Sequence, residues 1–314
     1  MRVYLTGADG MLGTALAGAL RTDPATADWA VLGVSKADFD VADAAAVSAS
    51  IDGFAPDVVV HTAAHAIVDD CEADPKLALR VNVAGVRNIV QACRRARCRL
   101  IYLSSDYVFD GANPPPGGYR ETDTPNPLSV YGLTKLAGER TSALLDDHLN
   151  VRTSWLFGGA DERLDPVLAT VRQAGRGERV RLIADQYSLP TYVEDVASAI
   201  VFLLTSARDA TGTIHAANAM SASWFEVGEH ALSMFDPALA ATVAPERLAL
   251  DDCAFLGERP RNSTLNTERL AGLGYTMPSW RDAVRRFCER LHAAERAGPH
   301  VALGQPVPVT AASA

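Results

Sequence analysis

Short apolar runs alternate with segments of helical periodicity through the first half of the chain. The expected strands span residues 2–6, 30–35, 57–61, 98–103 and 150–157. Each run is short and apolar, as buried strands are. Between 75 and 97, by contrast, Val83, Val86 and Val90 recur at helical spacing. Strands that alternate with helices favour a parallel sheet covered on both faces, so we predict a doubly wound α/β fold.

A glycine pattern follows the first expected strand and leads into a helix. Gly7, Gly10 and Gly13 have the spacing of a dinucleotide fingerprint in the context of strand, turn and helix that such a fingerprint requires. Gly7 permits the tight turn, Gly10 lets the backbone approach a pyrophosphate, and Gly13 allows close packing of the helix. Met11 and Leu12 then lie at the helix N-terminus, where anions bind. We interpret this turn as part of a dinucleotide site; a helix entry with spare glycines is the alternative.

The end of the second expected strand bears on the choice of cofactor. About 20 residues after the glycines, enzymes that prefer NAD carry an acidic residue for the ribose 2′-hydroxyl, but this chain has Ser35 and Lys36. A hydroxyl and an ammonium group bind a 2′-phosphate that a carboxylate would repel. The sequence therefore favours NADPH, with NADH as the alternative if Lys36 only faces solvent. Asp40 and Val41 are expected at the adenine edge.

Tyr131 and Lys135 lie four residues apart on an expected helix, so their side chains share one face. An ammonium beside a phenol favours the phenolate, and we therefore expect Lys135 to lower the pKa of Tyr131 towards neutrality. Such a phenol can give or take a proton at neutral pH. Ser105 follows the expected strand at 98–103, at the edge where α/β sheets bind ligands, and its hydroxyl can bind the same substrate oxygen. In isolation this Tyr–Lys spacing is commonly a solvated helix face.

Residues after the third and fifth expected strands extend the candidate site. Ala63 and Ala64 are small enough for a cofactor to lie flat against their backbone. His65 is a candidate at the edge of the substrate. Trp155 is expected beside the nicotinamide, over the substrate ring, or alternatively in the core. Arg259 stands with a second arginine beside a turn, where two guanidinium groups suit a diphosphate.

Beyond residue 161 the regular alternation is lost. Helices are expected at 166–175, 194–204, 226–235 and 279–297, and strands at 180–183 and 213–216. We therefore predict a Rossmann-type dinucleotide-binding domain over residues 1–157, to which 192–217 return. A smaller, interleaved mixed α/β domain over 158–296 is expected to bind the substrate, and 297–314 to form a disordered tail.

Composition excludes several classes of function. The 314 residues carry a net charge of −9, and an acidic chain is a poor general binder of nucleic acid or anionic membranes. Five scattered cysteines lack the spacing of a metal site or a disulfide framework and indicate a reducing compartment. Because no apolar run reaches membrane-spanning length, we expect a cytoplasmic protein.

Together these motifs resemble those of the extended short-chain dehydrogenases/reductases and, more narrowly, of the dTDP-4-dehydrorhamnose reductase family. The resemblance covers residues 1–291. Besides the glycine turn and the Tyr-x-x-x-Lys pair, it rests on Ala63-Ala64-His65 with Val68-Asp69, Ser104-Ser105-Asp106-Tyr107-Val108-Phe109, Arg152-Thr153-Ser154-Trp155, Asp185-Gln186 with Pro190-Thr191, and Arg259-Pro260-x-Asn262-Ser263-x-Leu265-Asn266-Thr267.

The resemblance implies NADPH-dependent reduction of the C4 ketone of a nucleotide-linked 4-keto-6-deoxysugar. Ser105, Tyr131 and Lys135 match the family's catalytic triad, in which the tyrosine donates the proton, the lysine orients the cofactor ribose and the hydroxyl holds the carbonyl oxygen. The expected substrate contacts are His65, Ser105, Asp106, Tyr107, Trp155 and Arg259. Some members bind magnesium across a dimer through a glutamate that Ala15 replaces here, so we expect no metal and no such dimer, while another homo-oligomer stays open.

Two other functions are compatible with these motifs. An epimerase of the same superfamily recycles its cofactor, so stoichiometric consumption of NADPH would distinguish a reductase from it. A non-catalytic regulatory subunit would bind the dinucleotide without turnover. The presence of Tyr131, Lys135 and the Ser105 hydroxyl argues against that second alternative.

Overall fold

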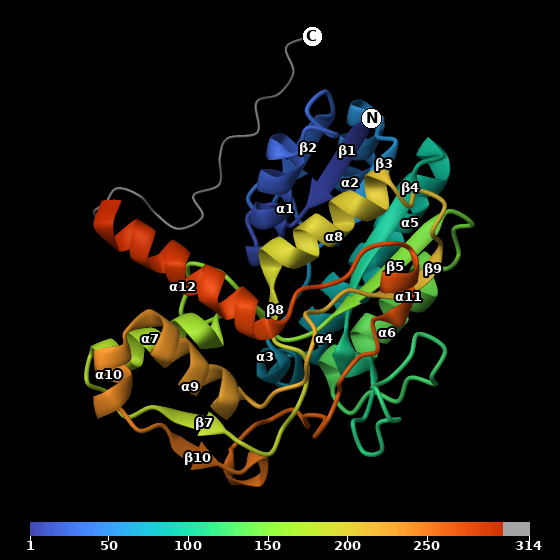
Figure 1. Ribbon diagram of the computed structural model, residues 1–314. Coiled ribbons are helices and arrows are strands. Elements are labelled where there is room, and N and C mark those ends of the chain that lie inside the picture. Colours follow the sequence, from blue (N-terminus) through green and yellow to red (C-terminus); the bar gives the residue numbers. More distant parts are fainter. Residues whose placement is uncertain (298–314) are drawn as a thin grey trace.

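Alternate residues of the parallel strands face two different hydrophobic cores. The computed structural model describes residues 1–297 (Figure 1). In β1 (Arg2–Thr6), Val3 and Leu5 belong to one core and Tyr4 to the other, as the two-residue period of a strand requires. Both faces of the sheet are therefore buried, which explains why its strands are apolar almost throughout.

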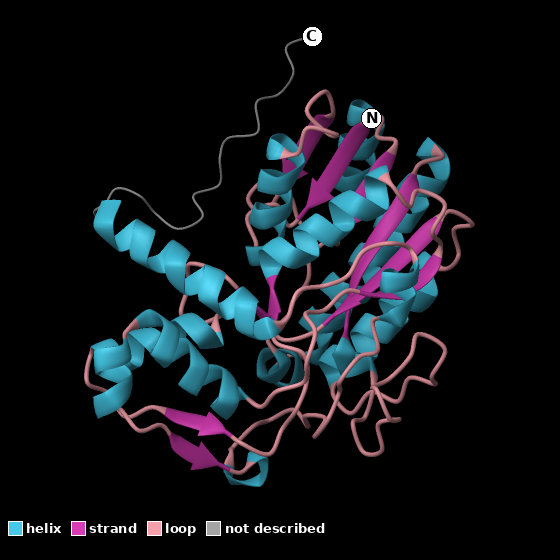
Figure 2. Ribbon diagram, in the orientation of Figure 1, coloured by secondary structure: helices cyan, strands magenta, loops and turns pink. Residues whose placement is uncertain are grey.

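Six parallel strands form the central sheet in the order β2-β1-β3-β4-β5-β9, drawn as adjacent magenta arrows in Figure 2. After β1 the strands are β2 (Ala30–Val34), β3 (Val58–His61), β4 (Arg99–Ser105), β5 (His148–Thr153) and β9 (Gly212–His215). The predicted doubly wound parallel sheet is confirmed. The order changes direction between β1 and β3, and such a switch point opens a ligand crevice at the carboxyl ends of the strands.

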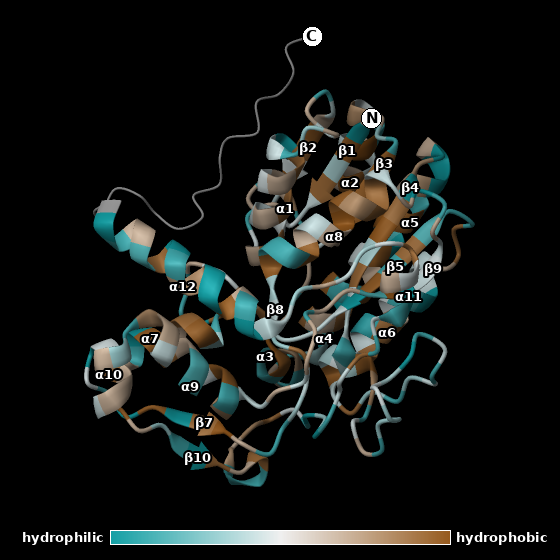
Figure 3. Ribbon diagram, viewed as in Figure 1, coloured by the Kyte–Doolittle hydropathy of each residue, from teal (hydrophilic) through white to brown (hydrophobic). Residues whose placement is uncertain are grey.

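Helices cover both faces of the sheet, and in Figure 3 the brown, hydrophobic positions concentrate where helices and strands meet. On one face lie α1 (Met11–Thr22) and α8 (Val193–Thr205), and on the other α2 (Ala44–Phe54) and α5 (Gly85–Ala96). The single helix expected at 75–97 consists of α4 (Pro75–Leu79), a π-helical turn (Arg80–Ala84) and α5. α6 (Val130–Ser142) packs beside α5 on that second face, against β4, and α3 (Val68–Ala73) lies at the carboxyl edge.

A second lobe lies beyond that edge (Figure 1). It contains α7 (Pro166–Gly175), β7 (Arg181–Ile183), α9 (Trp224–Phe235), α10 (Pro237–Thr242), β10 (Glu246–Leu248) and α12 (Trp280–Ala297), while the short α11 (Glu268–Gly272) lies beside β9. The parallel pair β7–β10 joins residues 65 positions apart in the chain, and β10 was not among the expected strands. Of the predicted tail, Ala297 ends α12 and 298–314 lie outside the described residues. No helix within residues 1–297 combines the length and apolarity needed to cross a bilayer.

The strand expected at 150–157 is interrupted, so the prediction of one continuous strand is wrong. β5 ends at Thr153, and β6 (Leu156–Phe157) pairs instead with β8 (Thr191–Tyr192). Between them Trp155 has a φ of 42°, in the left-handed region that extended strands do not use. The chain therefore leaves the central sheet here and enters the second lobe.

A buried ion pair connects α6 to the sheet. The Arg152 guanidinium on β5 donates two hydrogen bonds of 2.8 Å to the Glu139 carboxylate, and the side chains are only 4% and 5% exposed. Ser104 on β4 donates a further hydrogen bond of 2.5 Å to the same carboxylate. Charges so far from water are tolerated because each is paired and hydrogen-bonded.

We expect Glu139→Gln to lower the free energy of unfolding by about 3–5 kcal/mol, because it leaves the Arg152 charge buried without its counter-charge. Urea denaturation followed by circular dichroism measures this loss. The matched control is Glu289→Gln, which removes one partner of the exposed Arg285–Glu289 pair and should cost about 1 kcal/mol or less. Equal losses for the two variants would contradict the structural role given to the buried pair.

Candidate active site

The glycine turn between β1 and α1 has the geometry of a site for an anion. Gly7 adopts a φ of 67°, and a Cβ on Gly13 would lie 2.0 Å from the Gly7 carbonyl oxygen, so the helix packs directly on the turn. Gly10 caps α1 in an extended conformation without any side-chain hydrogen bond. The first-turn N–H groups, including those of Met11 and Leu12, therefore point from a helix N-terminus that no side chain caps, as a bound pyrophosphate requires.

The residues predicted to contact the adenosine part of the cofactor make hydrogen bonds and ion pairs within the protein. The Ser35 hydroxyl donates to the Asp38 carboxylate (3.1 Å), which also accepts the Ser35 N–H (2.7 Å), so an acidic side chain does stand beside this strand end. Lys36 is exposed. Asp40 pairs with Arg80 at 2.9 Å. Val41 packs against Gly85, which follows the π-helical turn: a Cβ on Gly85 would lie 2.8 Å from a methyl group of Val41.

Helix α6 approaches β4 and the 3-10 turn that follows it (Asp106–Val108) so closely that two of its positions have no room for a Cβ. A Cβ on Gly132 would lie 2.3 Å from the Tyr107 carbonyl oxygen, and one on Gly138 would lie 2.2 Å from the Tyr102 hydroxyl. The face of α6 between these glycines is therefore pressed into the protein. Lys135 lies on it and is 4% exposed.

The Tyr131 hydroxyl lies close enough to Ser105, at the end of β4, for the Ser105 hydroxyl to affect the pKa of Tyr131. The expected lowering of the Tyr131 pKa by Lys135 is wrong for this structure. Burial of the hydroxyl raises the pKa of Tyr131 well above its ordinary value; the Ser105 hydrogen bond opposes this shift, and the Asp106 charge adds to it. The phenol is therefore neutral at physiological pH.

Lys135 is directed towards the protein interior. Its ammonium donates a 2.5 Å hydrogen bond to the Leu103 carbonyl oxygen and lies 4.7 Å from the centre of the Tyr102 ring. Burial lowers the pKa of Lys135 to about 8, although the Glu139 carboxylate one helical turn away opposes the shift. Lys135 is therefore held by the protein interior and is not among the main causes of the Tyr131 pKa shift.

Asp106 is 1% exposed and accepts hydrogen bonds from four serine hydroxyls. The donors are Ser105 (3.1 Å), Ser154 (3.0 Å), Ser188 (2.9 Å) and Ser263 (2.5 Å). Burial raises the pKa of Asp106, and the four hydroxyls oppose that shift by stabilising the carboxylate. We call Asp106 and these residues the serine cage; it joins β4 to segments that follow β5, β7 and β10.

The loop after β3 is held by an asparagine whose role the sequence left undecided. Asn82 accepts the His65 N–H (2.7 Å) and donates to the His65 carbonyl (2.9 Å) and to Thr134 on α6 (2.9 Å). Ala63 lies against the glycine turn, since a Cβ on Gly7 would meet its N atom at 2.8 Å. Ala64 is thus fixed between two anchored residues at the carboxyl edge of the sheet.

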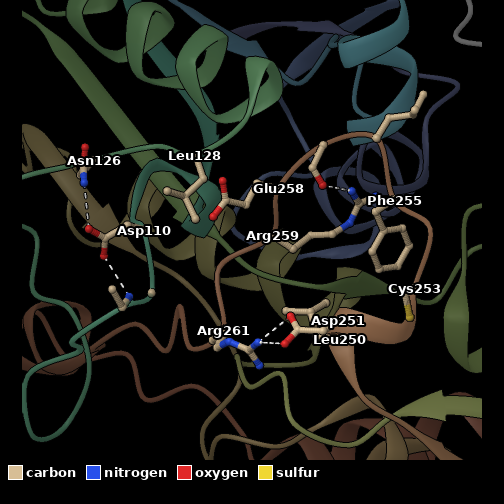
Figure 4. A pocket seen from close by; sticks show the side chains of 14 residues that line it. Asp110, Asn126, Leu128, Leu250, Asp251, Cys253, Phe255, Glu258, Arg259 and Arg261 are labelled. Atoms are coloured by element: carbon tan, nitrogen blue, oxygen red, sulfur yellow. Dashed lines mark hydrogen bonds and ion pairs between the residues drawn. The ribbon is translucent and has the colours of Figure 1, made fainter.

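Arg259 lines a cavity of about 610 Å³ between the lobes (Figure 4). Its guanidinium donates to Asp69 on α3 (2.7 Å) and lies 3.7 Å from the centre of the Phe255 ring. Arg261 pairs instead with Asp185 and Asp251. The two arginines predicted to bind a diphosphate together are therefore both engaged in pairs within the protein, and only Arg259 also lies next to α3.

Two of the predicted substrate contacts, Tyr107 and Trp155, are aromatic and pack against other rings. The Tyr107 ring meets the Tyr131 ring edge-on, with centroids 5.8 Å apart. Trp155 stacks on Trp224 of α9 at 4.4 Å, with the rings only 8° from parallel. Trp155 is only partly buried, so the alternative that it is a core residue is wrong.

Sequence patterns missed several neighbours of these groups. The Cys71 thiol of α3 is buried near Tyr131 and Lys135, and burial raises the pKa of Cys71 to about 11. Ser188 and Ser263 carry no local signal of their own, since a serine in a loop is ordinary. Within residues 1–297 we find no group of three His, Cys, Asp or Glu side chains placed to hold a metal ion.

Comparison with known proteins gives a consistent result. The family model described as the RmlD substrate binding domain matches residues 1–293. A dTDP-4-dehydrorhamnose reductase of Sinorhizobium fredii is 32% identical over 91% of this chain and 96% of its own, and one of Streptomyces griseus is 35% identical over 90% and 91%. The crystal structure of a dTDP-4-dehydrorhamnose reductase from Bacillus anthracis in complex with NADP superposes with a TM-score of 0.83 at 31% identity, covering 92% of this chain and 99% of that one.

Two buried neutral histidines predict loss of stability in acid. His61 is hydrogen-bonded to Thr6 at 2.7 Å and His215 to the Asn266 carbonyl at 3.0 Å, and burial lowers the pKa of each to about 3. The unfolded chain, in which histidine titrates near 6.5, binds these protons first, so stability is fully present above pH 6.5 and falls as the pH drops towards 3. Each histidine should contribute up to about 1.4 kcal/mol per pH unit in that window.

Urea denaturation between pH 7 and 4 measures this slope. The slope of the free energy of unfolding against pH reports the number of protons taken up on unfolding. We expect His61→Asn and His215→Asn each to reduce that number by up to one, and the double variant by up to two, whatever their effect on stability at pH 7. A double variant with the wild-type slope would show that these histidines are not the groups responsible.

Proposed function

This chain belongs to the family of the RmlD substrate binding domain, and from that membership we propose that it reduces the C4 ketone of a nucleotide-linked 4-keto-6-deoxysugar with NADPH. The observation that carries the proposal is the neutral Tyr131 phenol beside the Ser105 hydroxyl, at the carboxyl end of β4. A phenol that donates a proton must hold one before the reaction, and burial ensures that this one does. The relatives that match almost the whole chain are named as reductases of such a sugar.

In this proposal each residue has a distinct task. NADPH, when bound, would supply the hydride to the carbonyl carbon. The Ser105 hydroxyl holds the carbonyl oxygen, and Tyr131 transfers its proton to that oxygen as negative charge develops. Lys135, whose ammonium donates to the Leu103 carbonyl in the structure, is assigned the task of orienting the cofactor ribose.

The same proposal assigns the rest of the crevice. The uncapped first turn of α1 receives the pyrophosphate, with Ala63 and Ala64 along the cofactor. The cavity lined by Arg259 has a volume suited to the nucleotide part of the substrate. His65, Tyr107 and Trp155 border the sugar between these two regions.

The first test replaces the proton donor. We expect Tyr131→Phe to lower kcat by about 10²- to 10⁴-fold, the contribution of general acid catalysis, while the Kd for NADPH changes little. The measurements are NADPH oxidation with dTDP-, UDP- and GDP-linked 4-ketosugars and fluorescence titration of NADPH. Tyr275→Phe, which removes a hydroxyl near α8 and α12, is the control and should retain kcat.

Turnover of Tyr131→Phe at the wild-type rate would show that another group is the donor. If the wild type bound NADPH but consumed none with any ketosugar, the reductase proposal itself would fail, and a regulatory role would replace it. Isomerisation of the sugar without net NADPH oxidation would indicate an epimerase.

The second test concerns the cofactor's 2′-phosphate. We expect Lys36→Ala to raise the Kd for NADPH by about 3- to 10-fold, in the range of one partly solvated charge pair, and to leave the Kd for NADH unchanged. Lys76→Ala, which removes an exposed lysine on α4, is the control for net charge. Equal weakening of both cofactors, or none, would remove Lys36 from the 2′-phosphate site, and Asp38 beside Ser35 would then be expected to favour NADH.

A further inference from the structure

Trp155 has a backbone conformation that bulky residues rarely adopt. Its φ of 42° lies in the left-handed region, where an aromatic side chain is an outlier that persists only if its surroundings hold it. One restraint is the 3.1 Å hydrogen bond from the Thr191 N–H to the Trp155 carbonyl. That bond fixes the peptide group but leaves the direction of the indole to be set by its packing.

The packing partner is Trp224, the first residue of α9 in the second lobe. The two indoles lie almost parallel, with centroids 4.4 Å apart and an interplanar angle of 8°. A complete capping box fixes the start of α9: the Ser223 hydroxyl accepts the Glu226 N–H, and the Glu226 carboxylate accepts the Ser223 N–H at 2.8 Å. Trp224 is therefore presented from a rigid helix end.

This stacked pair is connected to the candidate catalytic residues through the serine cage. Ser154, which precedes Trp155, donates to Asp106 at 3.0 Å, and Asp106 accepts from Ser105 at 3.1 Å. The backbone of Trp155 is thus anchored one residue away from the cage that holds Ser105. Trp155 and Trp224 are both only partly buried, so the protein does not cover the pair completely.

We propose that Trp224 is a positioning residue that holds the Trp155 indole as an aromatic wall of the sugar site, and so sets its preference for 6-deoxysugars. The inference rests on the proposed function and adds a residue to it. A 6-deoxysugar exposes a methyl group and an apolar ring face, which pack on an aromatic plane, whereas a 6-hydroxyl group would lose hydrogen bonds to water there. Because Trp224 belongs to α9, the wall is complete only when the second lobe is docked.

The test compares Trp224→Ala with Trp224→Phe. An aromatic pair contributes a free energy that corresponds to about a 2- to 12-fold change in an equilibrium constant. We therefore expect Trp224→Ala to raise the KM for the 4-keto-6-deoxysugar nucleotide by about that factor, with kcat and the Kd for NADPH nearly unchanged. Trp224→Phe, which keeps a ring for stacking, should recover most of the wild-type KM.

A spectroscopic readout follows the pair directly. Two stacked indoles give an exciton couplet in circular dichroism, which both Trp224 variants and Trp155→Phe should abolish. Trp29→Phe is the matched control, because Trp29 directly precedes β2, at the amino end of the parallel strands and opposite the carboxyl edge; it should leave the couplet and the KM intact.

Loss of the couplet in Trp224→Ala with a wild-type KM would overturn the proposal, since Trp155 would then hold its place unaided. If the rise in KM were accompanied by a lower kcat and a weaker affinity for NADPH, the proposal would also be overturned, because such a result indicates general misfolding of the lobe. If the wild type proved inactive, calorimetric binding of a dTDP-linked 6-deoxysugar would take the place of KM. Weaker binding to Trp224→Ala than to the wild type would then support the aromatic wall, although the reductase proposal had failed. Equal binding to the two proteins would overturn the aromatic wall as well.

Discussion

The close packing of α6 against β4 governs the chemistry of the site. It is possible because Gly132 and Gly138 present no Cβ to the backbone and side chain they face. The side chains on the same face of the helix are consequently removed from water, and each charged group must find a partner within the protein. Lys135 finds the Leu103 carbonyl, and Glu139 finds Arg152. A helix held further from the sheet would admit water and return these groups to their ordinary protonation behaviour.

Desolvation, more than the neighbouring charge, sets the state of the tyrosine. A buried phenol resists ionisation, and the negative charge of Asp106 reinforces that resistance. The same burial weakens the proton affinity of Lys135. The lysine and the tyrosine therefore move towards uncharged forms together, which suits a site that awaits a charged cofactor and a substrate on which negative charge develops.

The serine cage is a second case in which a buried charge depends on partners within the protein, and here the partners come from both lobes. Asp106 is a buried carboxylate whose four hydrogen-bond donors are neutral hydroxyls, and two of them, Ser188 and Ser263, come from segments that belong to the second lobe. A buried charge is costly when it lacks donors. Docking of the second lobe therefore supplies hydrogen-bond donors that the Asp106 carboxylate needs, and these donors lie next to Ser105.

Local patterns in the sequence determined the doubly wound sheet, the glycine turn and the shared face of Tyr131 and Lys135, because each depends on the period of a strand or helix or on the conformational range of glycine. They did not determine the direction of the Tyr131 pKa shift, the pairing of Arg259 with Asp69, or the break at Trp155. Those depend on how deeply α6 is buried and on which distant segments meet: α3 with the 255–261 turn, and the end of β5 with α9. Ser188, Ser263 and Trp224 are ordinary residues in the sequence, and only tertiary packing, which brings chain segments more than 30 residues apart into contact, places them at the site.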